Sequence, residues 1–199
     1  MSSVLTLTKR LSVAALSSIA IAGAVVAPAN AAPTTAGCAA KSQPTITLGK
    51  ANGVRVEVPA AAGWRNDPTP NKTPFAVGQI ASADNQDGFN VRIGYPKDPD
   101  KIRTSADLAN TFASPDEGAS KALGRRTIAG PCGLPTVSVR HTFVDSTSKR
   151  VAYAVTRYTL LQHGSTTVGV IVQGASYDQQ RLADVERTLL DGYGIRLPA

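Results

Sequence analysis

The chain has 199 residues and a formal net charge of +7, with 42% hydrophobic and only 5% aromatic residues. This length fits one domain with a hydrophobic core, which must be built mainly from Val, Ile, Leu and Ala. The basic residues are scattered in runs no longer than two, whereas nucleic-acid-binding proteins gather them on one element between aromatic residues. The composition therefore argues against nucleic acid as a partner.

Residues 1–31 have the organisation of a secretory signal peptide. Lys9 and Arg10 precede an apolar run at residues 11–26, and Ala29-Asn30-Ala31 has the small-x-small pattern of a cleavage site. We expect cleavage between Ala31 and Ala32. The apolar run is shorter than the roughly 20 residues of a bilayer span, and no second such run follows. The sequence thus predicts a mature chain without a transmembrane segment, secreted or held in the periplasm or cell envelope.

Residues 32–44 are rich in Ala, Pro, Thr and Ser, a composition typical of a linker. We expect a single α+β domain at residues 45–199, and a monomer.

The two cysteines, Cys38 and Cys132, both follow the predicted cleavage site. An even number of cysteines in an exported chain predicts a disulfide bond between them. The alternative is a lipid anchor on Cys38, because residues 35–38 resemble a lipobox. Against it, residue 35 is Thr rather than Leu, and Cys38 lies well beyond the apolar run.

The first predicted elements of the domain are strands. Residues 54–58 alternate apolar with charged side chains and end at Pro59, and residues 75–80 and 89–93 have the same strand character. A short helix follows, capped by Thr104 or Ser105 and ended by residues 114–115.

Residues 123–174 predict the main sheet. Residues 123–129 form a strand, and residues 135–144, 151–162 and 166–174 form three longer strands joined by short polar turns, which is an antiparallel meander. In the strand at 135–144, Val137, Val139, His141 and Phe143 share one face.

A second helix closes the chain. Ser176 and Gln179 match a capping box, and Gly192 is expected as its left-handed C-cap. Leu182, Val185 and Leu189 form an apolar stripe that should cover one face of the sheet. The fold class is therefore α+β, an antiparallel β-sheet meander flanked by helices.

The residues that could carry catalysis form no recognisable constellation. A nucleophile elbow is missing, and His141 and His163 lie too far apart in the sequence for a histidine metal motif. Most carboxylates fall in predicted turns, and none pairs with another on one predicted strand face. The sequence thus predicts a protein that is not an enzyme, with no catalytic residues, metal or cofactor.

Three residues are candidates for the rim of a ligand site. Trp64 offers an aromatic face for a sugar or a lipid headgroup, although it could equally fill the edge of the core. Arg157 and Tyr158, on the longest predicted strand, could hold the polar head of an amphiphile.

Several stretches together resemble the LpqN/LpqT family of actinobacterial envelope proteins over about residues 45–197. They are Val56-Glu57-Val58-Pro59 with Gly63-Trp64, the turn at residues 129–135, the long strands through Tyr158 and Val172, and the capped C-terminal helix. The resemblance implies a Mog1/PsbP-like α/β sandwich. It also implies an exported, non-enzymatic protein of mycolate-type cell envelopes that binds envelope glycolipids or partner proteins. The family's named members are lipoproteins, and this chain departs from their lipobox, which favours a secreted or periplasmic form.

We therefore expect a cell-envelope protein that binds an envelope glycolipid or lipid. The alternative is a protein-interaction or structural factor that docks to an envelope protein. A deep apolar pocket would favour the lipid ligand, and a filled core with a flat apolar patch would favour docking.

Overall fold

The computed structural model describes residues 37–41, 43–51, 53–67, 76–112 and 121–197. The predicted signal peptide and its cleavage site at Ala31 and Ala32 lie outside these residues, as does the first part of the predicted linker.

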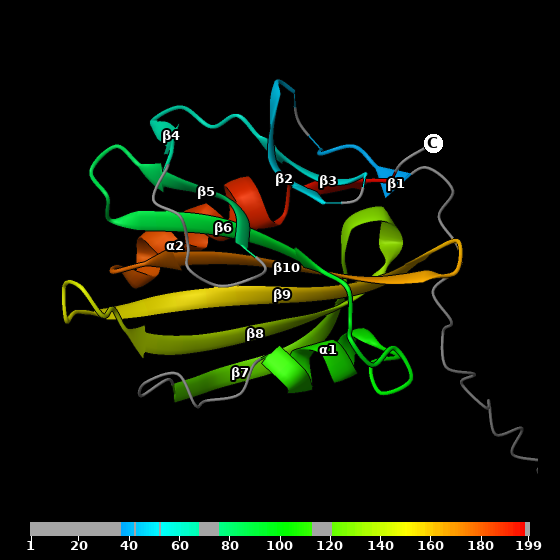
Figure 1. Cartoon of the computed structure of the whole chain (residues 1–199). Helices are drawn as coiled ribbons and strands as arrows, with labels where there is room; N and C mark the ends of the chain where they lie inside the picture. Colours follow the sequence, from blue (N-terminus) through cyan, green and yellow to red (C-terminus); the bar gives the residue numbers. More distant parts are fainter. Residues whose placement is uncertain (1–36, 42, 52, 68–75, 113–120, 198–199) are drawn as a thin grey trace, which may run out of the picture.

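The strands of the described residues form two antiparallel sheets (Figure 1). In spatial order, the small sheet contains β1 (Gly37–Cys38), β11 (Gly194–Arg196), β3 (Val54–Pro59) and β2 (Thr45–Ala51). The large sheet contains β4 (Trp64–Asn66), β5 (Ala76–Ser82), β6 (Asp87–Gly94), β10 (Thr166–Ser176), β9 (Val151–His163), β8 (Pro135–Val144) and β7 (Lys121–Ala129). The neighbouring strands β8, β9 and β10 confirm the predicted meander.

Helices lie on both faces of the large sheet. The helix α1 (Ser105–Phe112) packs on one face, against β8 and β9. The helix α2 (Gln179–Val185) continues into a π-helical turn, η2 (Glu186–Leu190), and packs on the opposite face beside the small sheet. A short 3-10 turn, η1 (Pro131–Gly133), joins β7 to β8. This arrangement confirms the predicted α+β class, an antiparallel sheet flanked by helices.

The main core lies between the large sheet and the layer formed by α2, η2 and the small sheet. Phe89 and Val172 of the large sheet are fully buried there with Val56 of the small sheet. Leu182, Val185 and Leu189 join the same cluster, which confirms the predicted apolar stripe. Because alternate side chains of a strand face opposite ways, only half of each central strand contributes to this core.

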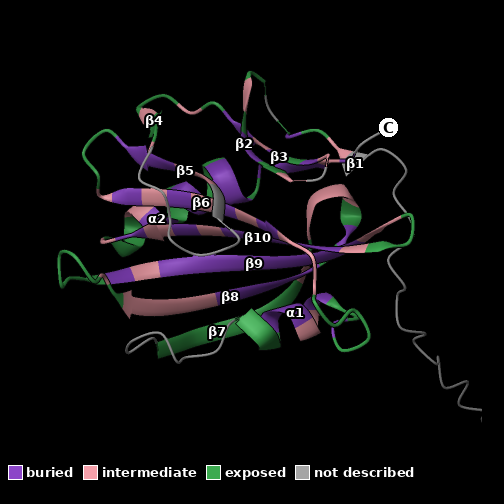
Figure 2. Cartoon of the chain, viewed as in Figure 1, coloured by how far each residue is buried: buried purple, intermediate pink, exposed green. Residues whose placement is uncertain are grey.

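A smaller apolar cluster lies under α1, on the other face of the large sheet. Leu108 and Ala109 of α1 contact the β8 residues Val137 and Val139 and also Tyr158 of β9. The central strands β9 and β10 are consequently buried on both faces, whereas β7 is exposed along most of its length (Figure 2).

The start of α2 differs from the prediction. The capping box of Ser176 and Gln179 was wrong, because Ser176 still pairs with β9 and β6 as the last residue of β10. Asp178 is the N-cap instead, and its carboxylate accepts hydrogen bonds from the backbone N–H groups of Gln180 (2.7 Å) and Arg181 (3.0 Å). Serine and aspartate are both favoured at the N-cap position. Because Ser176 is still paired as part of β10, Asp178 is the residue that caps the helix.

The end of this helix also differs. Gly192 was expected as a left-handed C-cap, but its φ is not positive, and the helix ends through the π-helical turn. Position 192 requires glycine because there is no room for a side chain: a Cβ atom there would lie 2.8 Å from Pro59 Cγ and 3.0 Å from the Thr188 carbonyl oxygen. By contrast, Thr104 caps α1 as expected, accepting a hydrogen bond from the backbone N–H of Asp107.

The disulfide bond predicted between Cys38 and Cys132 is present, with a Cα–Cα distance of 5.3 Å. It joins β1 to η1, and β1 pairs with β11 in the small sheet. Residues 37–38, within the expected linker, thus belong to the folded domain.

Replacing Asp178 with Ala is expected to lower the melting temperature at pH 7. The N–H groups of Arg181 and Gln180 lower the pKa of this carboxyl, so its stabilising effect is present above the unfolded pKa of about 3.9 and is lost as the pH falls through the lower folded pKa. The difference between Asp178→Ala and wild type should therefore shrink below about pH 4. Calorimetric melting from pH 7 to pH 3 tests this, and an unchanged difference at pH 3 would contradict it.

Candidate functional site

The structure does not bring the three candidate rim residues together. Arg157 and Tyr158 are consecutive in β9, so their side chains lie on opposite faces of the large sheet. Each residue is only 4% exposed. Trp64 lies at the edge of the sheet in β4, half-buried against the main core. Whether any of them binds a ligand stays a prediction.

Arg157 belongs to an ionic cluster in which its own side chain and that of Glu186 are buried, whereas the other charged side chains are exposed. Its guanidinium donates hydrogen bonds to Asp191 and to the Leu190 carbonyl oxygen, both at 2.5 Å, and lies 3.5 Å from the Glu186 carboxylate. Arg140 and Arg126 also contact Glu186. These contacts hold η2 against the large sheet, which is a structural role.

Trp64 lines a small separate pocket of about 200 Å³ beside α2. Arg181 on its wall is bound to the carboxylates of Asp84 and Asp87, at 2.7 Å and 2.5 Å. Because Arg181 is already occupied by two carboxylates, this pocket offers few free polar groups.

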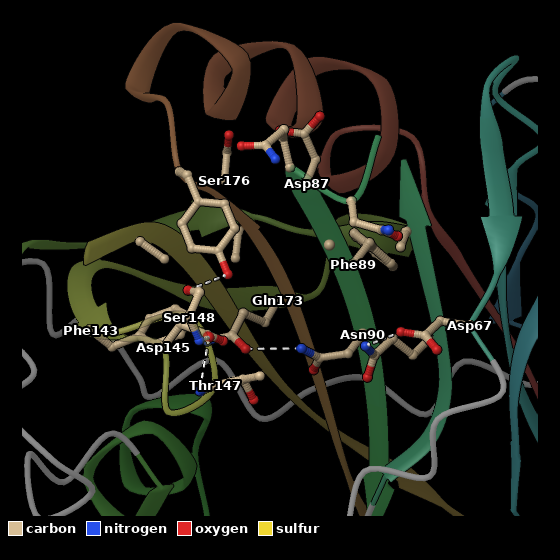
Figure 3. A pocket seen from close by; sticks show the side chains of 18 residues that line it. Asp67, Asp87, Phe89, Asn90, Phe143, Asp145, Thr147, Ser148, Gln173 and Ser176 are labelled. Atoms are coloured by element: carbon tan, nitrogen blue, oxygen red, sulfur yellow. Dashed lines mark hydrogen bonds between the residues drawn. The ribbon is translucent and has the colours of Figure 1, made fainter. Parts of the chain in front are cut away.

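The larger candidate site is a groove of about 490 Å³ in the large sheet (Figure 3). It lies over β5, β6 and β10 and is walled by the turn between β8 and β9. A volume of this size is within the range of small-molecule sites. We call this feature the polar groove.

A chain of hydrogen-bonded amides forms the floor of the polar groove. The Asn90 Nδ2 group donates to Gln173 Oε1 (2.9 Å), and Gln173 Nε2 donates to Thr156 Oγ1 (3.2 Å) and lies 3.4 Å from His141 Nε2. Beside them, Gln79 Nε2 donates to the Asp67 carboxylate (2.9 Å). These side chains come from neighbouring strands and share the face that points away from the main core.

Asn90 is incompletely satisfied. Its Oδ1 atom is buried and has no hydrogen-bond partner among the described residues. Since buried polar atoms in folded proteins almost always have a partner, an unpaired amide oxygen in the floor of a groove favours a site that a ligand hydroxyl completes.

Burial lowers the pKa of His141, which outweighs the raising effect of a backbone hydrogen bond at Val139. His141 is therefore neutral at pH 7, and its ring serves the amide chain as a hydrogen-bonding group.

The wall of the polar groove is held by contacts across its rim. The Ser148 hydroxyl donates to the Tyr177 hydroxyl at 3.1 Å, and the Arg150 guanidinium lies 4.0 Å from the centre of the Tyr177 ring. Arg150 also donates to Gln86 Oε1 at 3.0 Å, linking the turn after β8 to the turn before β6. A ligand would thus meet a preformed wall with an aromatic side chain.

The carboxylates that line the polar groove are each engaged with a donor. Asp87 binds Arg181, Asp67 accepts from Gln79, and Asp145 accepts from the backbone N–H of Ser148. The Ser148 N–H lowers the pKa of Asp145, which keeps that carboxyl ionised. The groove therefore offers amides, hydroxyls and aromatic edges, the groups that hold a polyhydroxylated ligand by hydrogen bonds.

The described ranges contain neither a group of three or more His, Cys, Asp or Glu side chains placed to hold a metal ion nor a helix long and apolar enough to cross a membrane.

The sequence reasoning missed Asn90, Gln173 and Gln79. The available signal was strand alternation, because Asn90 lies between Phe89 and Val91, and Gln173 follows Val172. Polar side chains on the face of a strand that points away from the core are usually in contact with solvent. Only the pairing of β6 with β10 shows that Asn90 and Gln173 lie side by side.

No protein-family model matches the chain, and no curated protein sequence matches it. Among solved structures, the chain is similar to the crystal structure of LpqN, a protein involved in cell envelope biogenesis of Mycobacterium tuberculosis. The two share 12% sequence identity with a TM-score of 0.49, over 77% of this chain and 90% of that chain.

Proposed function

We propose that this chain is an exported, non-enzymatic cell-envelope protein whose polar groove binds the sugar headgroup of an envelope glycolipid. The observation that carries the proposal is the amide floor, in which Asn90 donates to Gln173 and the Asn90 Oδ1 atom has no hydrogen-bond partner within the described part of the chain. A sugar hydroxyl both donates and accepts, so it can complete such a floor where an apolar ligand cannot. Support for export comes from the signal-type residues 1–31 and from the disulfide, which is typical of oxidising compartments.

Replacing Gln173 with Leu is expected to weaken glycolipid binding about tenfold or more. The substitution removes the Gln173 amide from the groove floor and with it the hydrogen bonds that this amide would make to a sugar hydroxyl, and the loss of one or two such bonds costs about 1–3 kcal/mol of binding free energy. Titration calorimetry of a panel of long-chain glycolipids, with their soluble sugars, measures the effect.

The matched control is Gln162→Leu. Gln162 also lies in the large sheet, near the C-terminal end of β9, and does not line the polar groove. Its side-chain amide donates a hydrogen bond to the Thr167 hydroxyl at 2.8 Å. Equal loss in both variants, or no binding of any glycolipid or sugar by wild type, would contradict the proposed function.

A second candidate function is docking to an envelope protein. It is favoured by three exposed apolar side chains near one end of β7, β8 and β9, namely Leu123 (51% exposed), Val144 (41%) and Val151 (53%). If Val151→Asp abolished association with one identified envelope protein while wild type bound no glycolipid, docking would replace sugar binding as the better account.

A further inference from the structure

The floor of the polar groove contains a row of small residues that crosses three neighbouring strands. Ala81 of β5 pairs with Gly88 of β6, and Gly88 pairs with Ala175 of β10, so the three residues lie side by side on one face of the large sheet. All three line the polar groove. Because none of them has a side chain longer than a methyl group, they form a shallow strip across the strands. We call it the small-residue strip.

Longer side chains stand on both sides of the small-residue strip and also line the groove. Two positions along the strands on one side lie the amides of Gln79, Asn90 and Gln173, which pair across the strands in the same order. In Figure 3 this amide row crosses the view through Asn90 and Gln173. Two positions away on the other side lie Gln86 and Tyr177, where the Tyr177 backbone N–H donates to the Gln86 carbonyl oxygen at 3.2 Å. The strip is therefore the bottom of a channel that runs across the strands.

Gly88 is a residue that neither the backbone conformation nor the packing of the described residues requires. Its φ is outside the left-handed region, and a Cβ atom built on it would have no described atom within 4 Å. By contrast, a Cβ atom on Gly174 of β10 would lie 2.8 Å from Val185 Cγ1 in the core. Glycine weakens a paired strand and often marks a place where a ligand approaches the backbone closely. Gly88 therefore favours a ligand that lies directly on the strip.

The length of the channel exceeds that of one sugar ring. The strip crosses β5, β6 and β10, and the groove also includes Ala152 of the next strand, β9. Neighbouring strands are about 4.8 Å apart, so these four strands span about 14 Å. The amides of Gln79, Asn90 and Gln173 recur at the same strand spacing, which is close to the length that one sugar ring adds to a linear chain. Successive rings can thus meet successive amides.

We propose that the polar groove holds a linear oligosaccharide whose rings lie along the small-residue strip, across the strands, with one ring directly over Gly88. The inference rests on the proposed function and specifies its headgroup as a chain of sugars rather than a single sugar. The face of a pyranose ring presents C–H groups to the strip, and its edges present hydroxyls to the amide row and to Tyr177. The Asn90 Oδ1 atom, which has no partner among the described residues, accepts a hydrogen bond from the central ring.

Titration calorimetry with chains of increasing length tests the inference. The probes are the mono-, di- and trisaccharides of the maltose, cellobiose and mannose series. In at least one series the affinity of wild type should rise tenfold or more from the monosaccharide to the trisaccharide, because each added ring contacts a further strand. Glycolipid binding without any gain from chain length would overturn the inference and leave the proposed function standing. If wild type bound neither sugars nor glycolipids, the proposed function itself would be contradicted.

Replacing Gly88 with Val separates the channel from the stability of the fold. Because the Cβ atom has room and valine favours a strand, the melting temperature should stay equal or rise. The added methyl groups occupy the strip, so the affinity for the best trisaccharide should fall at least tenfold. Ala175→Leu, at the next position of the strip, provides a second obstruction and should cause a similar loss.

The matched control is Gly124→Val in β7. Gly124 also has a φ outside the left-handed region and room for a Cβ atom among the described residues, but it lies beside a β-bulge and does not line the polar groove. This variant should bind like wild type. Unchanged affinity in Gly88→Val and Ala175→Leu, or an equal loss in Gly124→Val, would overturn the placement of the ligand on the strip.

Discussion

Removing the Cys38–Cys132 disulfide is expected to lower the free energy of unfolding by about 4–5 kcal/mol. The bond joins residues separated by 94 positions, so in the unfolded chain it closes a long loop and removes much conformational freedom. In the folded protein it holds β1, a strand of only two residues, beside β11. The loss is large compared with the usual stability of a domain, about 5–15 kcal/mol.

Urea unfolding of wild type, with and without a phosphine reductant, measures this contribution. The Cys38→Ser/Cys132→Ser variant should match reduced wild type and should not respond to the reductant. A loss below about 1 kcal/mol would show that the loop gains little freedom when the bond is broken, contrary to the chain-entropy argument.

Replacing Glu186 with Leu is expected to cost about 3 kcal/mol of unfolding free energy. Glu186 is 8% exposed and faces Arg157, whose side chain is 5% exposed, so the substitution leaves a buried guanidinium with less compensation. Breaking a buried ion pair by removing one partner costs about 3–5 kcal/mol. The lower figure applies because Asp191, at 2.5 Å, still contacts Arg157.

The double variant Arg157→Met/Glu186→Leu provides the decisive comparison. Removing both charges abolishes the uncompensated cation, so most of the lost stability should return. The control Asp184→Leu breaks an exposed pair with Arg187 and should cost less than about 1 kcal/mol. If the double variant were less stable than Glu186→Leu alone, Arg157 would have to stabilise the fold independently of Glu186.

The long strands could be predicted from the sequence, because apolar and polar residues alternate along each of them. Residues 135–144 and 151–162 alternate consistently, and the structure gives β8 and β9 nearly the same bounds. The small sheet was only partly predictable. Its strand β11 has three residues and β1 has two, which is too short for any periodicity, and both form only through pairing with distant partners.

The candidate site was harder to predict, because it depends on which strands become neighbours in the sheet. Arg157 and Tyr158 are adjacent in one strand, so alternation alone separates them to opposite faces, and this could have been inferred without a structure. Asn90 and Gln173 are 83 positions apart and meet only because β6 pairs with β10. No local pattern encodes that pairing, since it depends on which strands become neighbours.

The position of β1 determines how the domain would be oriented if it were attached to a surface through the chain that precedes Gly37. The disulfide and the pairing with β11 fix that exit point on the small sheet. The small sheet packs on one face of the large sheet, and the amides of the polar groove lie on the other. A tether at this end would therefore leave the amide floor turned away from the attachment point, toward material arriving from the surroundings.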